Sequence, residues 1–159
     1  MMRLLILPLA IICILVGCGT TKGTSDDAFA IEEAVVRYQL THNSSAQKEL
    51  AKVYCVEKLI GKSSSDAEDR LIERFRNQNR PVRKRSACVI NDESLLIDRL
   101  SGAQGLIIRF GTVVWKSDVE ATIEGGYYET NESASGNIFH LKQINGSWAV
   151  TKDEIKWIS

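Results

Sequence analysis

The chain has 159 residues, of which 44% are hydrophobic and 25% charged, a composition that suits one globular domain plus a targeting segment and excludes a disordered chain. Its 20 lysines and arginines balance its 20 aspartates and glutamates, so the whole chain has no net charge that would attract nucleic acid or an anionic membrane. We therefore expect no nucleic-acid partner.

The first element has the pattern of a signal peptide. Met1-Met2-Arg3 is a short basic start, and the thirteen residues that follow, 4–16, carry no charge. This run is shorter than the roughly 20 apolar residues that a membrane-spanning helix needs. It ends in Leu15-Val16-Gly17-Cys18, which resembles the lipobox of bacterial lipoproteins. The alternatives are a core helix or an ordinary signal peptide with a chance cysteine.

The lipobox resemblance implies a defined maturation. The thiol of Cys18 would receive a diacylglyceryl group, and the signal would be cut between Gly17 and Cys18. Two or more acyl chains hold a protein stably on a bilayer, whereas one holds it only marginally. Gly19 stands where aspartate is the usual inner-membrane retention signal of enteric bacteria. The resemblance thus predicts a cell-envelope lipoprotein, on the periplasmic face of the outer membrane if the source is Gram-negative.

The mature chain is expected to begin with a tether and a helix. Residues 19–27 are small and polar and predict a flexible linker, so the expected organisation is a signal peptide at 1–17, a lipidated cysteine with its tether at 18–27, and one domain at 28–159. Asp26 and Asp27 can cap a helix whose apolar residues recur with helical spacing from Phe29 to Tyr38. Residues 41–45 have loop chemistry and end it.

The next segments are more ambiguous. Residues 48–60 suit a helix or a strand, and their β-branched and aromatic residues favour a strand over 52–59. Residues 61–66 then predict a turn. A second helix is expected over 67–78, with Leu71, Ile72 and Phe75 as its apolar face. It ends there because Pro81 forbids its continuation.

From residue 82 the pattern is that of strands, expected over 82–90, 95–98, 106–115, 118–129, 138–144 and 148–151. Asn145-Gly146 is a strong signal for a two-residue hairpin. Gly125-Gly126 suggests a bulge, and residues 133–137 suggest a turn. This order of elements predicts an α+β fold, with two or three N-terminal helices packed on one strongly curved antiparallel sheet.

Two cysteines remain in the expected domain, Cys55 and Cys88, because Cys13 would be removed with the signal. A compartment outside the inner membrane permits disulfides, so the pair is either bonded or two buried free thiols. Nothing places a histidine beside either one to make a catalytic thiol. No spacing typical of metal ligands occurs, and no phosphate-binding loop does either, so we expect no metal and no cofactor.

Two further groups of residues are candidates for a site. The segment Arg74–Arg85 has six basic residues in twelve, which indicates either an anion site or a solvated helix end. Arg109 lies between apolar neighbours in an expected strand. It either points to solvent or lines a ligand cavity, together with Asp98, Tyr127 and His140.

The C-terminal half resembles small bacterial proteins of the nuclear transport factor 2-like type. The resemblance rests on GGYYETNESASGNIFHLKQINGSWAVTKDEIKWIS at residues 125–159, and more weakly on Val53-Tyr54-Cys55 and Arg74-Phe75. It implies a cone-like domain with helices inside a bent antiparallel sheet. That superfamily includes isomerases, cyclases, dehydratases and domains without chemistry, so the resemblance implies no activity.

These patterns favour a lipid-anchored envelope protein with a non-catalytic domain that binds a small ligand or an envelope protein. The second reading is a cavity enzyme of the isomerase or dehydratase kind, using a carboxylate with a tyrosine or histidine, and the third is a tethered inhibitor or immunity-type protein. A closed apolar pocket with a buried carboxylate beside tyrosine or histidine would favour the enzyme. A pocket filled by Phe110, Trp115 and Tyr127 would oppose it.

Overall fold

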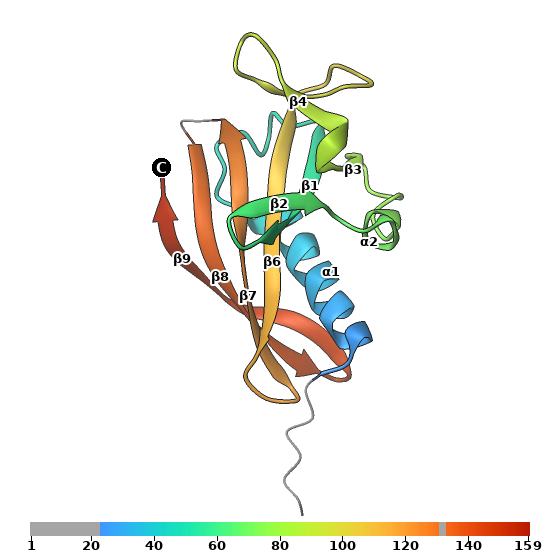
Figure 1. The fold of residues 1–159 in the computed structure, drawn as a ribbon, viewed down its shortest axis with the longest axis vertical. Coiled ribbons are helices and arrows are strands. Elements are labelled where there is room, and N and C mark those ends of the chain that lie inside the picture. Colours follow the sequence, from blue (N-terminus) through green and yellow to red (C-terminus); the bar gives the residue numbers. More distant parts are fainter. Residues whose placement is uncertain (1–22, 131–132) are drawn as a thin grey trace, which may run out of the picture.

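The computed structural model describes residues 23–130 and 133–159, so the predictions for residues 1–17, Cys18 and residues 19–22 lie outside the described residues. Within the described part, one long helix packs against a large mixed sheet (Figure 1). The elements are α1 Ser25–His42, β1 Val53–Ile60, β2 Ser63–Asp66, α2 Asp69–Glu73, β3 Val82–Lys84, the 3₁₀ turn Arg85–Ala87, β4 Cys88–Ile90, β5 Leu96–Asp98, β6 Gly105–Trp115, β7 Glu120–Thr130, β8 Ser133–Ile144 and β9 Ser147–Ile158.

The predicted fold of two or three helices on a curved antiparallel cone is wrong, because the domain is mostly β and its second helix has five residues. The segment expected to continue that helix forms tight turns, in which Phe75 N–H donates to the Ile72 carbonyl at 3.0 Å and Gln78 N–H to the Phe75 carbonyl at 3.1 Å. These hydrogen bonds join residues three positions apart, as in a 3₁₀ helix, and they let the segment bury Leu71 and Phe75 and still turn back toward β3.

The main sheet is mixed, which also differs from the prediction. In the described residues its seven strands run in the order β2-β1-β6-β7-β8-β9, with β3 beside β1. β1 is parallel to both β3 and β6, and the other pairs are antiparallel. The connection over residues 61–104 is long enough to carry the chain back to the end at which β1 began, as a parallel pair requires. β4 and β5 form a separate two-stranded sheet.

The first predicted helix is confirmed, with a different cap. Thr24 is the N-cap residue, and its hydroxyl accepts a hydrogen bond from Asp27 N–H at 3.1 Å while the Asp27 carboxylate accepts one from Thr24 N–H at 3.1 Å. This reciprocal capping box satisfies two free donors of the first turn. The buried apolar residues of α1 are Ile31, Val35 and Val36, so the helix is rotated relative to the face expected from Phe29 and Tyr38.

Several predicted strands are confirmed within one or two residues, namely β1, β5, β6 and β7. The hairpin at Asn145-Gly146 is also confirmed, with φ angles of 51° and 78°. The strand expected over 82–90 is interrupted, because Ser86 N–H and its hydroxyl both donate to the Asp66 carboxylate, at 2.8 and 2.6 Å. The turn expected over 133–137 is wrong, since these residues form the start of β8.

The predicted bulge at Gly125-Gly126 is displaced to the neighbouring strand. The register between β6 and β7 shifts between Phe110 and Val113, whereas the β7–β8 register is regular past both glycines. Gly126 is required for another reason. Its φ is 146°, and a Cβ there would overlap the Ser135 carbonyl on β8.

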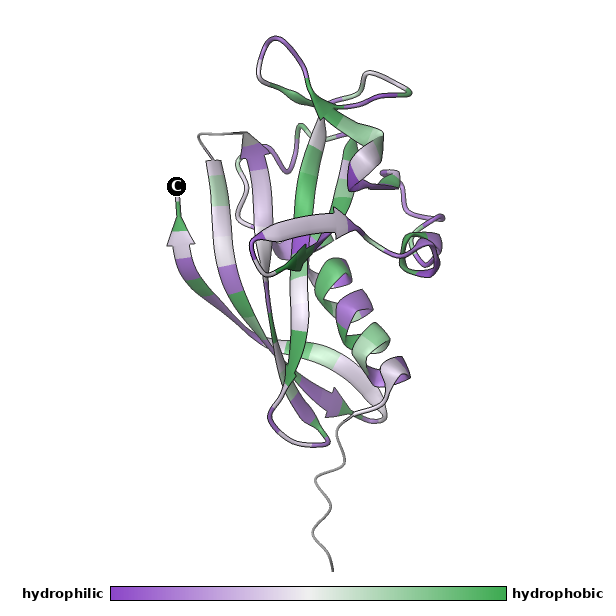
Figure 2. Ribbon diagram, viewed as in Figure 1, coloured by the Kyte–Doolittle hydropathy of each residue, from purple (hydrophilic) through white to green (hydrophobic). Residues whose placement is uncertain are grey.

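The sheet separates two apolar clusters. Alternate residues of β1 and β6, such as Tyr54, Val56 and Ile108, pack with α1 in the main core. The residues between them, Cys55 and Ile107 among them, form a smaller cluster on the other face, beneath the β4–β5 hairpin. Apolar segments of β1, β6 and α1 meet in the centre of the molecule (Figure 2).

Candidate functional site

A pocket of about 340 Å³ lies on the main sheet and draws its lining from β1, β6, β7, β8 and β9. Its apolar lining includes Leu59, Ile138 and Trp157, and its charged lining consists of Arg109, Glu124 and Lys156. Side chains alternate between the two faces of a sheet, so Leu59 shares a face with Cys55 on β1, and Arg109 shares a face with Ile107 on β6. This is the face opposite to α1. The volume is within the range of small-molecule sites.

The guanidinium of Arg109 is held at this pocket by a buried carboxylate. Arg109 Nε donates to Glu57 Oε1 at 2.6 Å, and the Glu57 side chain is only 3% exposed. The same guanidinium stacks on the ring of Tyr128, with Cζ 4.5 Å from the ring centre. Its terminal nitrogens form no hydrogen bond with any other residue that the structure describes. Arg109 is therefore oriented through Nε and keeps donors for a ligand.

The backbone of Arg109 is fixed as well. Its carbonyl accepts a hydrogen bond of 2.9 Å from Gln39 Nε2, which reaches the sheet from the last turns of α1. Gln39 is buried, and its own Oε1 has no hydrogen-bond partner among the described residues. Arg109 is thus held from both faces of the sheet.

Glu57 also lies 3.5 Å from Arg85 Nε, so it faces two guanidinium groups. Near the other wall of the pocket, Glu154 contacts both Lys156, at 2.9 Å, and Lys152, at 3.2 Å. Contacts from Lys156, His140 and Lys152 lower the pKa of Glu154 to about 2. The charged residues that line the pocket itself, Arg109, Lys156 and Glu124, are two cations and one carboxylate, so their formal charge is +1, which favours an anionic ligand.

Trp157 forms the apolar wall of the pocket at the edge strand β9. Its indole ring lies directly on Gly136 of β8, where a Cβ would overlap the ring. The residue is nevertheless 52% exposed, so one side of the ring remains accessible. A half-exposed indole resting on a glycine offers a flat stacking surface.

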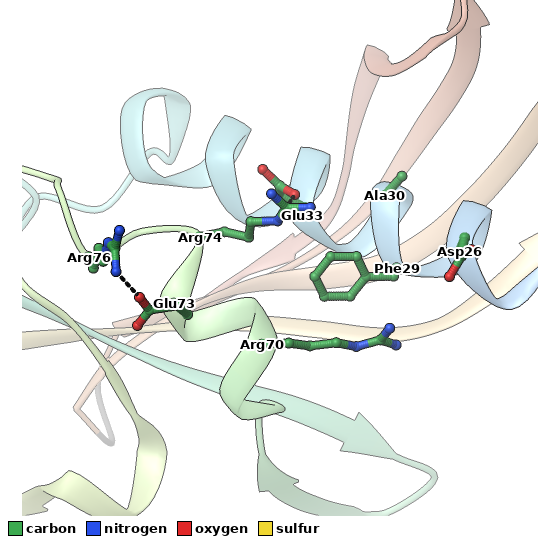
Figure 3. Close-up of a pocket in the computed structure, with 8 residues that line it drawn as sticks. All are labelled: Asp26, Phe29, Ala30, Glu33, Arg70, Glu73, Arg74 and Arg76. Carbon is green, nitrogen blue, oxygen red and sulfur yellow. Dashed lines mark hydrogen bonds and ion pairs between the residues drawn. The ribbon is translucent and has the colours of Figure 1, made fainter.

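A second hollow, of about 770 Å³, lies between α1 and α2 (Figure 3). Phe29 lies at its centre, and the guanidinium carbons of Arg70 and Arg74 are 4.2 and 5.8 Å from its ring centre. Its charged side chains already pair with one another, Arg74 with Glu33 at 3.4 Å and Arg76 with Glu73 at 2.6 Å. This groove is open and internally neutralised, so we regard it as the weaker candidate.

The basic segment Arg74–Arg85 does not form an anion site, because carboxylates of the domain take up most of its charge. Beside the two pairs of the α1–α2 groove, Arg80 lies 3.5 Å from Glu49 and Lys84 lies 2.7 Å from Asp69. Arg85 contributes to the Glu57 cluster. The segment therefore ties the long β1–β6 connection to the rest of the fold.

The four residues proposed from the sequence as one cavity do not come together. Arg109 lines the sheet pocket, whereas Tyr127 is buried on the α1 side of the sheet. Asp98 is buried at the end of β5, where the Ser101 hydroxyl donates to it at 2.6 Å and lowers its pKa. His140 lies 3.1 Å from Glu154, and both side chains are about a third exposed, at 36% and 34%.

The interior in which an isomerase-like cavity would lie is filled. Phe110 and Tyr127 are buried in the main core, and Trp115 packs against it. The space beside Tyr127 has a volume of about 10 Å³, no more than one water molecule needs. Neither histidine of the described part lies in this interior, and the pair His140–Glu154, with Nε2 3.1 Å from Oε2, is at the surface.

The two domain cysteines are bonded to each other. Cys55 and Cys88 form a disulfide with Cα atoms 6.4 Å apart and a sequence separation of 33. The sequence left the disulfide and two free thiols open. The interruption of the strand at Arg85–Ala87 places Cys88 on the face of the sheet that Cys55 occupies.

Sequence reasoning missed Glu57 and Trp157. The sequence held only a weak indication of Glu57, a carboxylate in an expected strand that lies two residues after Cys55 and so faces the same side of the sheet. No family model, curated protein or solved structure matches the chain. In residues 23–130 and 133–159, no helix is long and apolar enough to span a bilayer, and no group of histidine, cysteine and acidic residues could hold a metal ion.

Proposed function

We propose that this protein is a lipid-anchored cell-envelope lipoprotein whose domain binds a ligand without catalysing a reaction. The anchor is supported by the basic start, the short apolar run and the Leu15-Val16-Gly17-Cys18 box. The expected location is the periplasmic face of the outer membrane if the source is Gram-negative.

The binding role is carried by one observation, the pre-positioned guanidinium of Arg109 beside the half-exposed indole of Trp157. A guanidinium with free terminal donors suits a carboxylate or another flat anionic group. The indole, together with Leu59 and Ile138, suits an aromatic or aliphatic body. We infer a ligand that joins an anionic group to an apolar one, as a free acid or at the end of a partner's chain.

The anchor is tested by replacing the acceptor thiol. Cys18→Ser should abolish labelling by a fatty-acid analogue and leave the chain at its unprocessed length on a gel. Cys13→Ser is the matched control, because it removes a thiol of the same apolar segment and should leave labelling intact. Unchanged labelling of Cys18→Ser would refute the anchor.

The binding site is tested with 3-phenylpropionate and its neutral amide as probes, followed by proton–nitrogen NMR spectra of the protein. The acid should shift the indole N–H signal of Trp157, and the amide should shift it far less. Arg109→Lys keeps a cation opposite Glu57 but loses the planar fork, so it should weaken binding of the acid. Arg76→Gln, in the α1–α2 groove, is the control. Equal shifts with acid and amide would count against an anion site.

A further inference from the structure

The amino-terminal end of α1 and two sheet turns form one end of the molecule. The turn over residues 116–119 joins β6 to β7, and Asn145-Gly146 joins β8 to β9. The two turns touch, because Gln143 N–H donates to the Val119 carbonyl at 2.9 Å. Figure 1 shows this end below and the β4–β5 hairpin at the opposite end above. We call the lower end the turn end.

Aromatic contacts fix the start of α1 to the turn end. The rings of Trp115, the last residue of β6, and Trp148, near the start of β9, pack edge to face with centres 5.6 Å apart. Trp148 Nε1 donates to Asp27 Oδ1 at 3.1 Å. The backbone of Gly23 lies against the ring of Trp115, where a Cβ would overlap it. The chain therefore enters the domain at the turn end.

The distance from Cys18 to this entry point is short. Gly23 comes five positions after Cys18, and a fully extended chain of that length spans at most about 18 Å. A globular domain of this size has a radius of gyration of about 14 Å and so a diameter of about 37 Å. A lipid on Cys18 would therefore hold the turn end near the bilayer and keep the β4–β5 end out of reach.

The turn end exposes apolar side chains at its tips. Val119 is 50% exposed and Ile144 is 49% exposed, each beside the hydrogen bond that joins the two turns. The nearby cations Lys116 and Lys142 are matched by Asp118 and Glu120, and Lys142 pairs with Glu120 at 2.7 Å. The two turns are thus apolar at their tips and electrically balanced around them, and Asp26 and Asp27 at the start of α1 add negative charge to this end.

We propose that the turn end docks on the lipid bilayer, with Val119 and Ile144 entering the headgroup region. This orientation rests on the proposed lipid at Cys18. The short reach from Cys18 identifies the bilayer as the surface that covers these tips, since in every anchored state the bilayer lies within about 18 Å of Gly23, where the chain enters the turn end. Because the charges of the turn end show no excess of cations, contact depends on apolar burial rather than on anionic lipid.

The test uses the full lipidated protein in phosphatidylethanolamine vesicles that contain spin-labelled lipid. Val119→Cys and Ile144→Cys each supply a single free thiol for a fluorescent label, because Cys55 and Cys88 are bonded and Cys18 is acylated. Leu100→Cys is the matched control, an exposed apolar residue after β5 at the far end. We expect blue-shifted and strongly quenched emission at 119 and 144, unquenched emission at 100, and no change with added salt.

The outcomes separate the orientation from the anchor. Vesicle flotation of all three labelled proteins with equal, weak quenching would overturn docking while leaving the anchor intact. Failure of all three to float would overturn the anchor, and the orientation with it. Quenching at 119 and 144 that disappears in salt would overturn apolar docking.

Discussion

The buried carboxylate of Glu57 provides the sharpest test of how the sheet pocket is held together. Two Glu–Arg pairs of the domain have the same separation of 2.6 Å and opposite surroundings. In Glu57–Arg109 the side chains are 3% and 26% exposed, and in Glu73–Arg76 they are 63% and 69% exposed. Glu57→Gln and Glu73→Gln remove the same charge at the same distance, so burial is the main difference.

The expected magnitudes follow from solvation. Removing one partner of a buried pair costs about 3–5 kcal/mol, because the other charge is left without compensation. Arg109 and Arg85 remain 26% and 30% exposed and can regain some water, and glutamine can still accept a hydrogen bond. We therefore expect a loss of about 2–3 kcal/mol for Glu57→Gln. Glu73→Gln should cost about 0–1 kcal/mol.

Urea unfolding of the purified protein, followed by tryptophan fluorescence, measures the difference. A domain of this size has a slope near 2 kcal/mol per molar urea, so the unfolding midpoint of Glu57→Gln should fall by about 1–1.5 M. The midpoint of Glu73→Gln should hardly move. Equal shifts for the two variants would refute the reasoning, since the exposed fraction of an ion pair would then not govern its contribution to the free energy of unfolding.

Three further outcomes follow from the structure. Replacing both Cys55 and Cys88 by alanine should lower stability by about 3–4 kcal/mol, seen as a melting temperature about 10 °C lower, because the bond closes a separation of 33 residues. Gly126→Ala should cost more than about 2 kcal/mol in the same assay and Gly146→Ala about 1 kcal/mol, because both have positive φ but only Gly126 is crowded by another strand. The lowered pKa of Asp98 means that its ionised form stabilises the fold above its unfolded pKa of about 4, and that this contribution is lost as the pH falls through the lower folded pKa. Asp98→Asn should therefore reduce the melting temperature at pH 7 and flatten the decline of the melting temperature as the pH falls below about 4. An unchanged decline in acid would contradict this assignment.

Local signals predicted the elements whose contacts are near in sequence. The alternation in β6 and β7 and the Asn145-Gly146 turn specify antiparallel neighbours joined by short loops, so pattern and structure agree. The prediction of a helix over 67–78 was wrong because Leu71 and Phe75, although spaced as on one face of a helix, can be buried equally well by tight turns.

The pairing of strands that are far apart in the chain could not be predicted from the sequence. The parallel alignment of β1 with β6 depends on where a connection of more than forty residues ends, and no local pattern records that. The pocket has the same origin, since Glu57, Arg109 and Trp157 meet only once β1, β6 and β9 have taken their places in the sheet. Arg109 stood out as a cation among apolar neighbours, but its partner could not be inferred.

The disulfide also changes what a protease can do to this protein. The segment Arg74–Arg85, with five basic positions that are not followed by proline, lies wholly between Cys55 and Cys88. A cut there opens the backbone but leaves a covalent path around the break, so both pieces stay joined. The carboxy-terminal piece holds β6 to β9, and the amino-terminal piece holds α1 and the expected anchor. A nicked molecule would therefore keep its sheet attached to the membrane and would come apart only under reduction.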